Sequence, residues 1–203
     1  PYRMFTSRAE YRILLRQDNA DQRLTPIGYS IGLADESRIK KMESKKENIE
    51  RLIHFIKTNN ALPEEVNKSF EELNTPIITQ KTKLSQLLLR PQINLDILKN
   101  NVPYLNAEIN KTPAEIKLQV EECAEILVKY ESYIKKEEEI VSKLSHFENL
   151  VIKDDFDYHS LKSLSFEARE KLSKIRPKTI GQAGRISGVS PADISVLVIY
   201  ISR

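Results

Sequence analysis

Three arginines near the start of the chain have a spacing that suggests chemistry. Arg8, Arg12 and Arg16 recur every four residues in a segment that predicts a helix, with Ser7 and Glu10 as its capping box. Their guanidinium groups would form a stripe about 12 Å long, at ~1.5 Å per residue. Like charges at this spacing repel each other and destabilise a helix. The repulsion must therefore be offset by acidic side chains or by a bound polyanion.

Phosphate is a suitable polyanion, because a planar guanidinium group can donate to two of its oxygens at once. We therefore predict a polyanion-binding surface made of Arg3, Arg8, Arg12, Arg16 and Arg23. The alternative is internal pairing, in which Glu10, Asp18 and Asp21 neutralise the arginines and the neighbouring leucines lie in the core. The spacing alone leaves both readings open.

The end of the chain is the second candidate surface. Ser165, Thr179 and Ser190 each have the sequence context of a helix cap, which predicts three short helices with Gly188 in the turn before the last. The final helix is apolar on more than one face, through Ile194, Val196, Leu197, Val198, Ile199 and Ile201. Such a terminal helix is either fully buried or covered on a second side by another protein.

Conventional catalytic and metal-binding patterns are missing from the sequence. The three histidines stand apart from other ligand-type residues, and Cys123 falls on an apolar helix seam, which predicts a core residue rather than a nucleophile. Gly181, Gly184 and Gly188 follow no strand and lack the spacing of a dinucleotide-binding loop. We therefore predict that the chain holds no catalytic residue, no metal and no cofactor of its own.

The composition indicates the elements that position these residues. Of 203 residues, 40% are hydrophobic and 30% charged, with only five glycines and no tryptophan, which is typical of a helical protein. Net charge is +4 over residues 1–60, −1 over 61–110, −3 over 111–150 and +3 over 151–203, so the two ends are basic. No apolar run approaches ~18 residues, so we predict no membrane span. Because the chain starts at Pro1 and has no signal peptide, we expect a piece of a longer protein.

Two long helices dominate the predicted fold. Asp35 caps one that carries an apolar stripe to about residue 58, and Thr112 caps one that reaches roughly residue 146. Shorter helices are expected at 7–16, 20–24, 25–32, 63–73, 83–89 and 94–100. The predicted class is all-α, with a long antiparallel helix pair, short connecting helices and a compact C-terminal three-helix module. We place one domain at residues 1–150 and the other at 151–203.

Several stretches resemble one known family. They are PYRMFTSRAEYR at 1–12, DNADQRLT at 18–25, VKYESYI at 128–134, the FDY and LS motifs at 156–158 and 164–165, and RPKTIGQA with RISGVSPADI across 176–194. Together they resemble the MnmG (GidA) family of bacterial tRNA uridine 5-carboxymethylaminomethyl modification enzymes. The resemblance runs from end to end and is weakest across 60–110. Gly184 stands where a serine is expected in the family.

The resemblance implies a reaction and its partners. The parent enzyme would be a cytoplasmic flavoprotein that uses FAD and NADH and works with the GTPase MnmE on carbon 5 of the wobble uridine of tRNA. Its flavin domain and catalytic cysteines would lie in an N-terminal part outside this chain, and the full enzyme would be a homodimer. The arginine-rich opening would bind tRNA. The implied GTPase-docking residues are Ile180, Gly181, Arg185, Gly188, Pro191, Ile194 and Leu197.

A different reading of the same residues is a stand-alone helical adaptor or a helix-turn-helix DNA-binding protein. It depends on the turn at Gly188 and on the basic ends of the chain. Such a protein needs a basic recognition helix, and the final helix is apolar. The sequence therefore favours the tRNA-enzyme reading.

Overall fold

The computed structural model describes residues 11–201, without the side chains of residues 143–146. The predicted all-α class is confirmed, because helices account for nearly all regular structure in the described residues. The chain divides into two compact units, Pro1–Lys135 and Lys136–Arg203, which are described separately. The predicted domain boundary after residue 150 lies beyond this division and stays a prediction.

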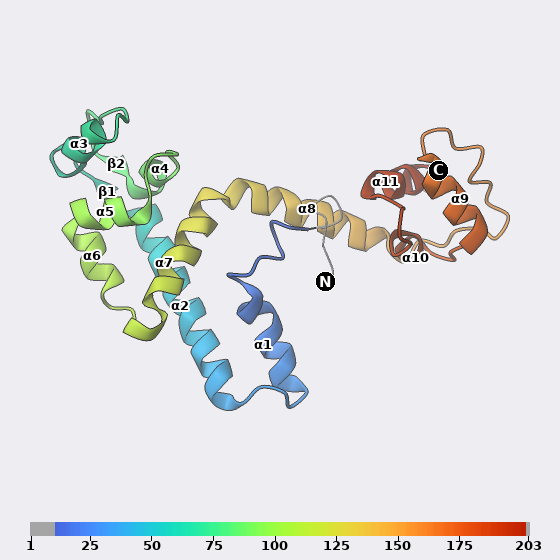
Figure 1. Cartoon of the computed structure of the whole chain (residues 1–203), viewed down its shortest axis with the longest axis horizontal. Coiled ribbons are helices and arrows are strands. Elements are labelled where there is room, and N and C mark those ends of the chain that lie inside the picture. Colours follow the sequence, from blue (N-terminus) through green and yellow to red (C-terminus); the bar gives the residue numbers. More distant parts are fainter. Residues whose placement is uncertain (1–10, 202–203) are drawn as a thin grey trace, which may run out of the picture. The chain divides into compact units, whose positions relative to one another are not determined.

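The first unit contains one long helix, several short helices and a minimal sheet (Figure 1). In chain order its elements are α1 (Ala20–Ser30), α2 (Glu36–Thr58), β1 (Asn60–Ala61), α3 (Pro63–Glu72), β2 (Thr82–Lys83), α4 (Leu84–Leu88), α5 (Leu95–Asn101), α6 (Pro103–Ile109) and α7 (Ala114–Lys129). The helix α8 (Glu131–Phe147) begins in this unit and extends beyond it. The two strands pair antiparallel, with Asn60 opposite Lys83 and Ala61 opposite Thr82.

Helix α2 forms as its sequence predicts. The Asp35 carboxylate accepts a hydrogen bond from the Arg38 backbone N–H at 2.8 Å, which satisfies one of the free donors of the first turn. Its apolar stripe, with Ile49, Leu52 and Ile56, is buried in the core of the unit and packs mainly on α7. The predicted partnership of these two helices is therefore confirmed.

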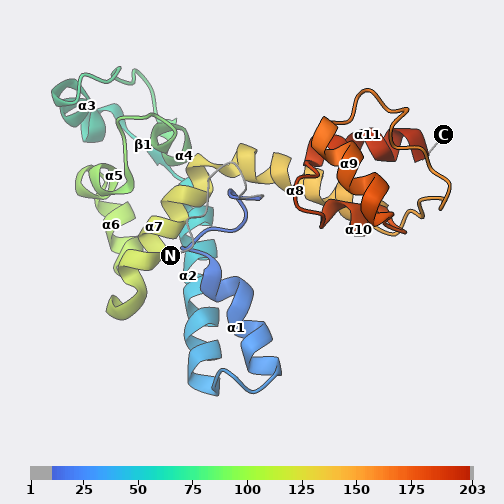
Figure 2. The same ribbon diagram turned by 45° about the vertical axis from the view of Figure 1, so that its right-hand side comes forward.

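The predicted antiparallel direction of this pair is wrong. Met42 and Ile116, near the starts of α2 and α7, line the same groove, whereas Lys57 near the end of α2 pairs with Glu131 just past the end of α7. The two helices therefore run in the same general direction and cross, as Figures 1 and 2 show. The reason lies in the connection, because the short helices α3 to α6 return the chain from the far end of α2 to Arg51, which contacts Glu108 and Thr112 just before α7 begins.

The second long helix is interrupted. A continuous helix was expected to about residue 146, but α7 ends at Lys129 and α8 starts at Glu131. The apolar stripe of α7 remains in the core as far as Val128, while Tyr130 is exposed. Glu131 pairs with Lys135 at 2.7 Å and Lys57 at 2.9 Å, and hydrogen bonds from these two lysines lower the pKa of its carboxyl group. The break thus coincides with the point where the chain leaves the core.

Two predicted helix starts are also wrong. Pro26 lies inside α1, so residues 20–30 form one helix instead of two. Thr112 does not cap α7, because Pro113 is the N-cap residue and makes no side-chain cap bond. The Thr112 hydroxyl instead accepts a hydrogen bond from Arg51 Nη2 at 2.9 Å. In both places a longer-range contact or a continuing helix overrides a local start signal.

The second unit holds the three predicted short helices. They are α9 (Phe166–Ile175), α10 (Ile180–Gly184) and α11 (Pro191–Ile201), and their core is built around Tyr158, Leu172 and Leu197. Ser165 caps α9 through the Ala168 N–H, as predicted. Thr179 likewise caps α10 through the Gln182 N–H.

Asp193 joins the starts of two of these helices. Its carboxylate accepts hydrogen bonds from the Ser165 N–H at 2.8 Å and from the Ser190 N–H at 2.9 Å, and the Ser190 hydroxyl accepts from the Asp193 N–H at 3.2 Å. The last two bonds complete the predicted capping box. Burial by itself would raise the pKa of Asp193, but the hydrogen bonds from Ser165 and Ser190 outweigh it and hold the pKa below its ordinary value.

We expect Asp193→Asn to lower the free energy of unfolding of the second unit by about 1–3 kcal/mol at neutral pH, because buried donors lose a charged acceptor. Since the folded pKa is lowered, this stabilisation is present above the unfolded pKa of about 3.9 and is lost as pH falls through the folded value. Hydrogen–deuterium exchange of α9 and α11 amides measures the lost stability at neutral pH. Thermal unfolding at pH 7 and pH 3 tests whether the difference between the variant and the unmodified chain shrinks as the pH falls.

Asp155→Asn is the matched control, because Asp155 is an exposed aspartate in the same unit. It should leave both measurements within about 0.5 kcal/mol of the unmodified chain. Equal effects of the two substitutions, or an Asp193→Asn difference that is no smaller at pH 3 than at pH 7, would contradict the role given to Asp193.

Candidate nucleic-acid interface and partner surface

The segment before α1 is a turn and not the predicted helix. Tyr11 has a left-handed φ of 56°, and its carbonyl oxygen accepts hydrogen bonds from the N–H groups of Leu14 at 3.0 Å and Leu15 at 2.8 Å. The helix expected over residues 7–16 is therefore wrong for residues 11–16. Arg3 and Arg8, with the predicted Ser7–Glu10 cap, lie outside the described residues.

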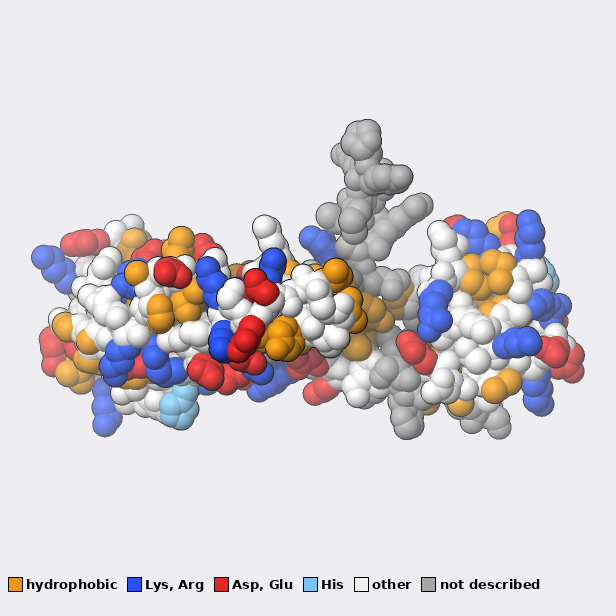
Figure 3. Space-filling view, turned by 90° about the horizontal axis from the view of Figure 1, so that it is seen from below, with side chains coloured by type: hydrophobic (Ala, Val, Ile, Leu, Met, Phe, Trp, Pro, Cys, Tyr) orange, Lys and Arg blue, Asp and Glu red, His pale blue; other side chains and the backbone are white. Residues whose placement is uncertain are grey.

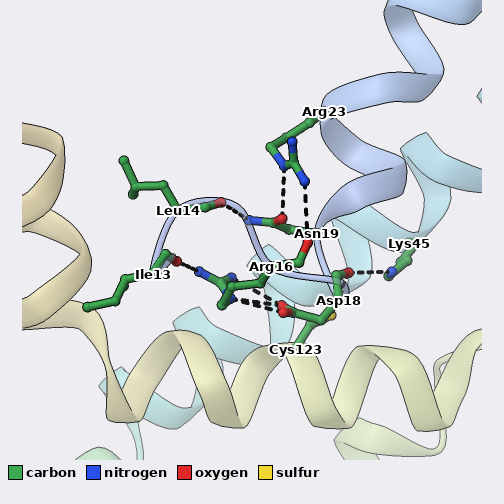
Figure 4. Close-up of polar contacts among 8 residues, drawn as sticks. All are labelled: Ile13, Leu14, Arg16, Asp18, Asn19, Arg23, Lys45 and Cys123. Carbon is green, nitrogen blue, oxygen red and sulfur yellow. Dashed lines mark hydrogen bonds and ion pairs between the residues drawn. The ribbon is translucent and has the colours of Figure 1, made fainter. Parts of the chain in front are cut away.

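Arg16 is paired within the chain. Its Nε donates to Asp18 Oδ1 at 2.9 Å and its Nη2 to Asp18 Oδ2 at 3.1 Å, while Nη1 donates to the Ile13 carbonyl (Figure 4). The guanidinium group therefore holds both ends of the turn together. For this arginine the structure favours the internal-pairing reading over a free phosphate-binding group.

Arg23 is similarly occupied. Its Nε donates to Asn19 Oδ1 at 3.0 Å, and Asn19 Nδ2 in turn donates to the Leu14 carbonyl at 2.8 Å (Figure 4). A weaker bond at 3.4 Å joins Arg23 Nη2 to the Arg16 carbonyl. Thus an arginine on α1 contributes to the same turn that Arg16 closes.

A buried lysine connects this turn to α2. Lys45, which is 5% exposed, donates from Nζ to the Asp18 carbonyl at 3.1 Å and to Asp21 Oδ2 at 2.8 Å. Lys45 was not among the predicted site residues, although its position three residues after Met42 and four before Ile49 puts it in the register of the apolar stripe. A charged residue at such a position needs a buried partner.

Cys123 reaches the same carbonyl from α7. Its thiol donates to the Asp18 carbonyl at 3.5 Å (Figure 4), and burial raises the pKa of the thiol. The predicted core position is confirmed. The turn is thus held to α2 and α7 through one backbone oxygen.

Arg12 differs from the other described arginines of the opening. It is exposed and forms no ion pair with a residue in the range 11–201. Of the five predicted tRNA-binding arginines, the structure therefore presents Arg12 to solvent and uses Arg16 and Arg23 to shape the turn.

An open groove lies beside this network. It has a volume of about 900 Å³ and is formed by α1, α2, α7 and the segments next to α1. Charged and apolar side chains share its walls, among them Asp21, Leu24, Leu33, Arg38 and Glu122. The Asp21–Lys45 pair lies in the wall, so part of the charge there is already neutralised.

The predicted partner-binding residues of the second unit fall into two groups. Ile180, Ile194 and Leu197 are buried in its core, so their side chains pack the unit rather than face a partner. Gly181 is also packed inward, because a Cβ there would lie 3.1 Å from the Glu148 carbonyl. The exposed members are Arg185, Gly188 and Pro191.

Gly188 is required by the turn that leads to α11. Its φ of 95° is in the region that favours glycine, and a Cβ would collide with the Glu167 carboxylate. Lys171, which pairs with that carboxylate at 2.6 Å, also donates to the Ser187 carbonyl. The turn is thus anchored to α9.

Helix α11 is only partly buried within the second unit. Ile199 and Tyr200 are exposed, and so are Val151, Phe166 and Ile175 elsewhere in the second unit. In Figure 3 apolar side chains gather on the visible surface of this unit among Lys and Arg side chains. This arrangement is compatible with a protein partner.

Neither a metal-ligand cluster nor a dinucleotide-binding turn at the α10 glycines is found among the residues that the structure describes. No group of three His, Cys, Asp or Glu side chains there could hold a metal ion. Gly181 and Gly184 lie in α10 and not in a strand-to-helix turn, so these residues do not fit the phosphates of a dinucleotide cofactor. Across the same residues, none of the helices has both the length and the apolarity needed to cross a membrane.

Comparison with known proteins gives matches along the whole chain. A family model described as the tRNA modifying enzyme MnmG/GidA C-terminal helical domain matches residues 36–138, and one described as its C-terminal helical bundle matches residues 140–203. Curated relatives named tRNA uridine 5-carboxymethylaminomethyl modification enzyme MnmG include those of Parabacteroides distasonis, 49% identical, and Cytophaga hutchinsonii, 52% identical. Each match covers 100% of this chain and 32% of the relative.

Solved structures give the same result. The chain is similar to Aquifex aeolicus GidA in its form II crystal, with a TM-score of 0.61, 35% identity and coverage of 100% of this chain and 30% of that one. The form I crystal matches with a TM-score of 0.58. The chain therefore spans about a third of the length of the relatives that it matches.

We expect Arg16→Ala to weaken the turn by about 1–3 kcal/mol, because it removes charge-assisted hydrogen bonds from a mostly buried pair. Faster hydrogen–deuterium exchange of residues 13–23 would report the change. Arg12→Ala is the control and should alter exchange by less than about 0.5 kcal/mol, since Arg12 is exposed. Equal responses would show that the Arg16–Asp18 pair does not hold the turn.

Proposed function

Because the chain belongs to the MnmG/GidA family of tRNA-modifying enzymes, we propose that it is the region with which such an enzyme recognises tRNA and docks a GTPase partner. The whole enzyme would act on carbon 5 of the wobble uridine of tRNA in the cytoplasm, as a homodimer, together with MnmE. The names of the relatives, which specify a modification at position 5 of a tRNA uridine, support this reaction.

In this proposal the chain itself is not catalytic. FAD and NADH would be held by the enzyme's own N-terminal flavin domain, to which this region is joined. Two observations support that division of labour: the relatives are about three times as long as the chain, and Gly181 and Gly184 do not form a dinucleotide-binding turn. When bound, the flavin would supply the redox chemistry of the reaction. The residues described here would bind and orient macromolecules.

The observation that carries the tRNA proposal is an exposed arginine on a fixed turn. Arg16 and Arg23 hold the turn by internal bonds, which leaves the Arg12 guanidinium group free of ion pairs with described residues. A preorganised cation binds phosphate with less loss of conformational freedom than one on a mobile loop. We propose that Arg12 contacts the tRNA backbone, with Arg3 and Arg8 beside it in sequence, while Arg16 and Arg23 position the turn.

We expect Arg12→Glu in the full-length enzyme to weaken tRNA binding at least several-fold. It should also reduce the slope of log affinity against log salt by about 0.7–0.9 for each phosphate that the variant no longer neutralises. Fluorescence-detected titration of labelled tRNA at several salt concentrations provides the measurement. Lys68→Glu, a reversal of another exposed charge on α3, is the control.

Two results would count against this role of Arg12. One is an unchanged affinity and salt slope in Arg12→Glu. The other is an equal loss in Lys68→Glu, which would indicate a general charge effect. Flavin content should be the same in all variants, because the flavin is proposed to bind elsewhere.

GTPase docking is proposed for the exposed parts of α10, α11 and the turn between them. Arg185, Gly188 and Pro191 lie on the surface there, and Ile199 and Tyr200 add apolar area on α11. Ile180, Gly181, Ile194 and Leu197 would support this surface from within the unit. Apolar and aromatic groups beside an arginine are typical of the energetically important part of a protein interface.

We expect the double substitution Ile199→Ser with Tyr200→Ser to weaken binding of the purified family GTPase at least tenfold, as measured by isothermal titration calorimetry. Both side chains are exposed, so the fold should survive. Val151→Ser, which changes an exposed apolar residue outside α10 and α11, is the control. Undiminished binding by the double variant would place the GTPase elsewhere.

The alternative of a stand-alone adaptor or helix-turn-helix DNA-binding protein receives no comparable support. Helix α11 has no lysine or arginine between Pro191 and Ile201. A recognition helix needs basic or amide side chains that reach phosphates and base edges.

A further inference from the structure

Helix α1 carries an exposed apolar stripe that no described residue covers. Leu24 is 57% exposed, Ile27 is 59% exposed and Ile31, at the end of the helix, is 64% exposed. Their spacing of three and four places them on one face of a helix. Leu33, 81% exposed, lies two residues after Ile31. We call these four residues the α1 stripe.

A neighbouring face of α1 is already occupied. Thr25 is buried and Asp21 pairs with Lys45, so these residues bind α1 to α2. In Figures 1 and 2 α2 runs beside α1. Leu24 and Leu33 also line the groove of about 900 Å³, so the α1 stripe and the groove form one continuous surface. A contiguous apolar surface of this kind marks an interaction site.

The charges beside the α1 stripe indicate the chemistry of what covers it. Asp21 is neutralised by Lys45, and Asp18 by Arg16. The surface therefore presents exposed apolar side chains beside two acidic groups that are already paired, while Arg38 and Glu122 add one charge of each sign to the groove wall. A mainly apolar protein surface fits it better than a highly charged polymer does.

The comparisons indicate which protein surface would cover the α1 stripe. Residues 1–35 lie outside both C-terminal family models, which begin at residue 36, yet the relatives match the chain over its whole length. About two thirds of each relative's polypeptide lies outside this region. Since the models are described as C-terminal, that polypeptide precedes it in the family.

We propose that the α1 stripe is an interface inside the enzyme, on which the preceding polypeptide of the family packs. This inference deepens the proposed function, since it takes the chain to be one region of a longer enzyme. Arg23 of α1 bonds to Asn19 and Arg16, so docking of α1 also fixes the turn that carries Arg12. The interface would set the position of the tRNA-binding arginine relative to the rest of the enzyme.

The test compares α1 in the isolated chain and in a full-length chimera. In the chimera the matched region of the Cytophaga hutchinsonii relative is replaced by this chain. Hydrogen–deuterium exchange of residues 20–31 should be at least tenfold slower in the chimera than in the isolated chain. Ile27→Lys with Ile31→Lys should remove most of this protection in the chimera and leave the helical circular dichroism of the isolated chain unchanged.

Leu118→Lys is the matched control, because Leu118 is 69% exposed on α7, within the C-terminal model. It should leave the protection of α1 intact. If the lysine pair prevents the chimera from folding, Ile27→Ser with Ile31→Ser is the milder variant for the same comparison.

Two outcomes would overturn the proposal. One is equal exchange of α1 in the isolated chain and the chimera. The other is protection that appears only as the isolated chain dimerises in sedimentation experiments, which would make a second copy the occupant. Loss of tRNA or GTPase binding by a chimera whose α1 remains protected would contradict the proposed function and not this interface.

Discussion

The first unit depends on one buried cation. Lys45 lies in the apolar register of α2, where an unpaired ammonium group would be costly, and Asp21 together with the Asp18 carbonyl satisfies it. This requirement draws α1 and the preceding turn onto α2. Arg16 and Arg23 then complete the turn, at the start of which Arg12 is exposed.

The second unit uses a buried anion in a comparable way. Asp193 binds the backbone at the starts of α9 and α11, two helices far apart in sequence. Some of the residues predicted to touch a partner are buried in this unit and others are exposed: Ile194 and Leu197 lie in the core, and Pro191 lies on the surface. A firm internal scaffold therefore supports the surface that we propose for GTPase docking.

Local signals were sufficient for much of the fold. Asp35, Ser165 and Thr179 cap helices as predicted, because a cap bonds to backbone within three residues. The all-α class follows from such signals. The direction of α7 relative to α2 does not follow from local signals, because it depends on the path of the four helices between them. The break at Tyr130 likewise depends on where the core ends. The partner of Arg16 was one of several acidic candidates, and only the tertiary structure selects Asp18.

The position of Cys123 has a practical consequence. It is the only cysteine of the chain, it is buried, and its thiol donates to the same Asp18 carbonyl that binds Lys45. Because Cys123 is only 2% exposed, we expect slow reaction of the sulfur with a maleimide or disulfide reagent while the turn is in place, and the raised pKa of the thiol slows reaction further. The rate at which Cys123 is modified therefore reports opening of the turn that carries the arginines, and no cysteine has to be introduced for the measurement.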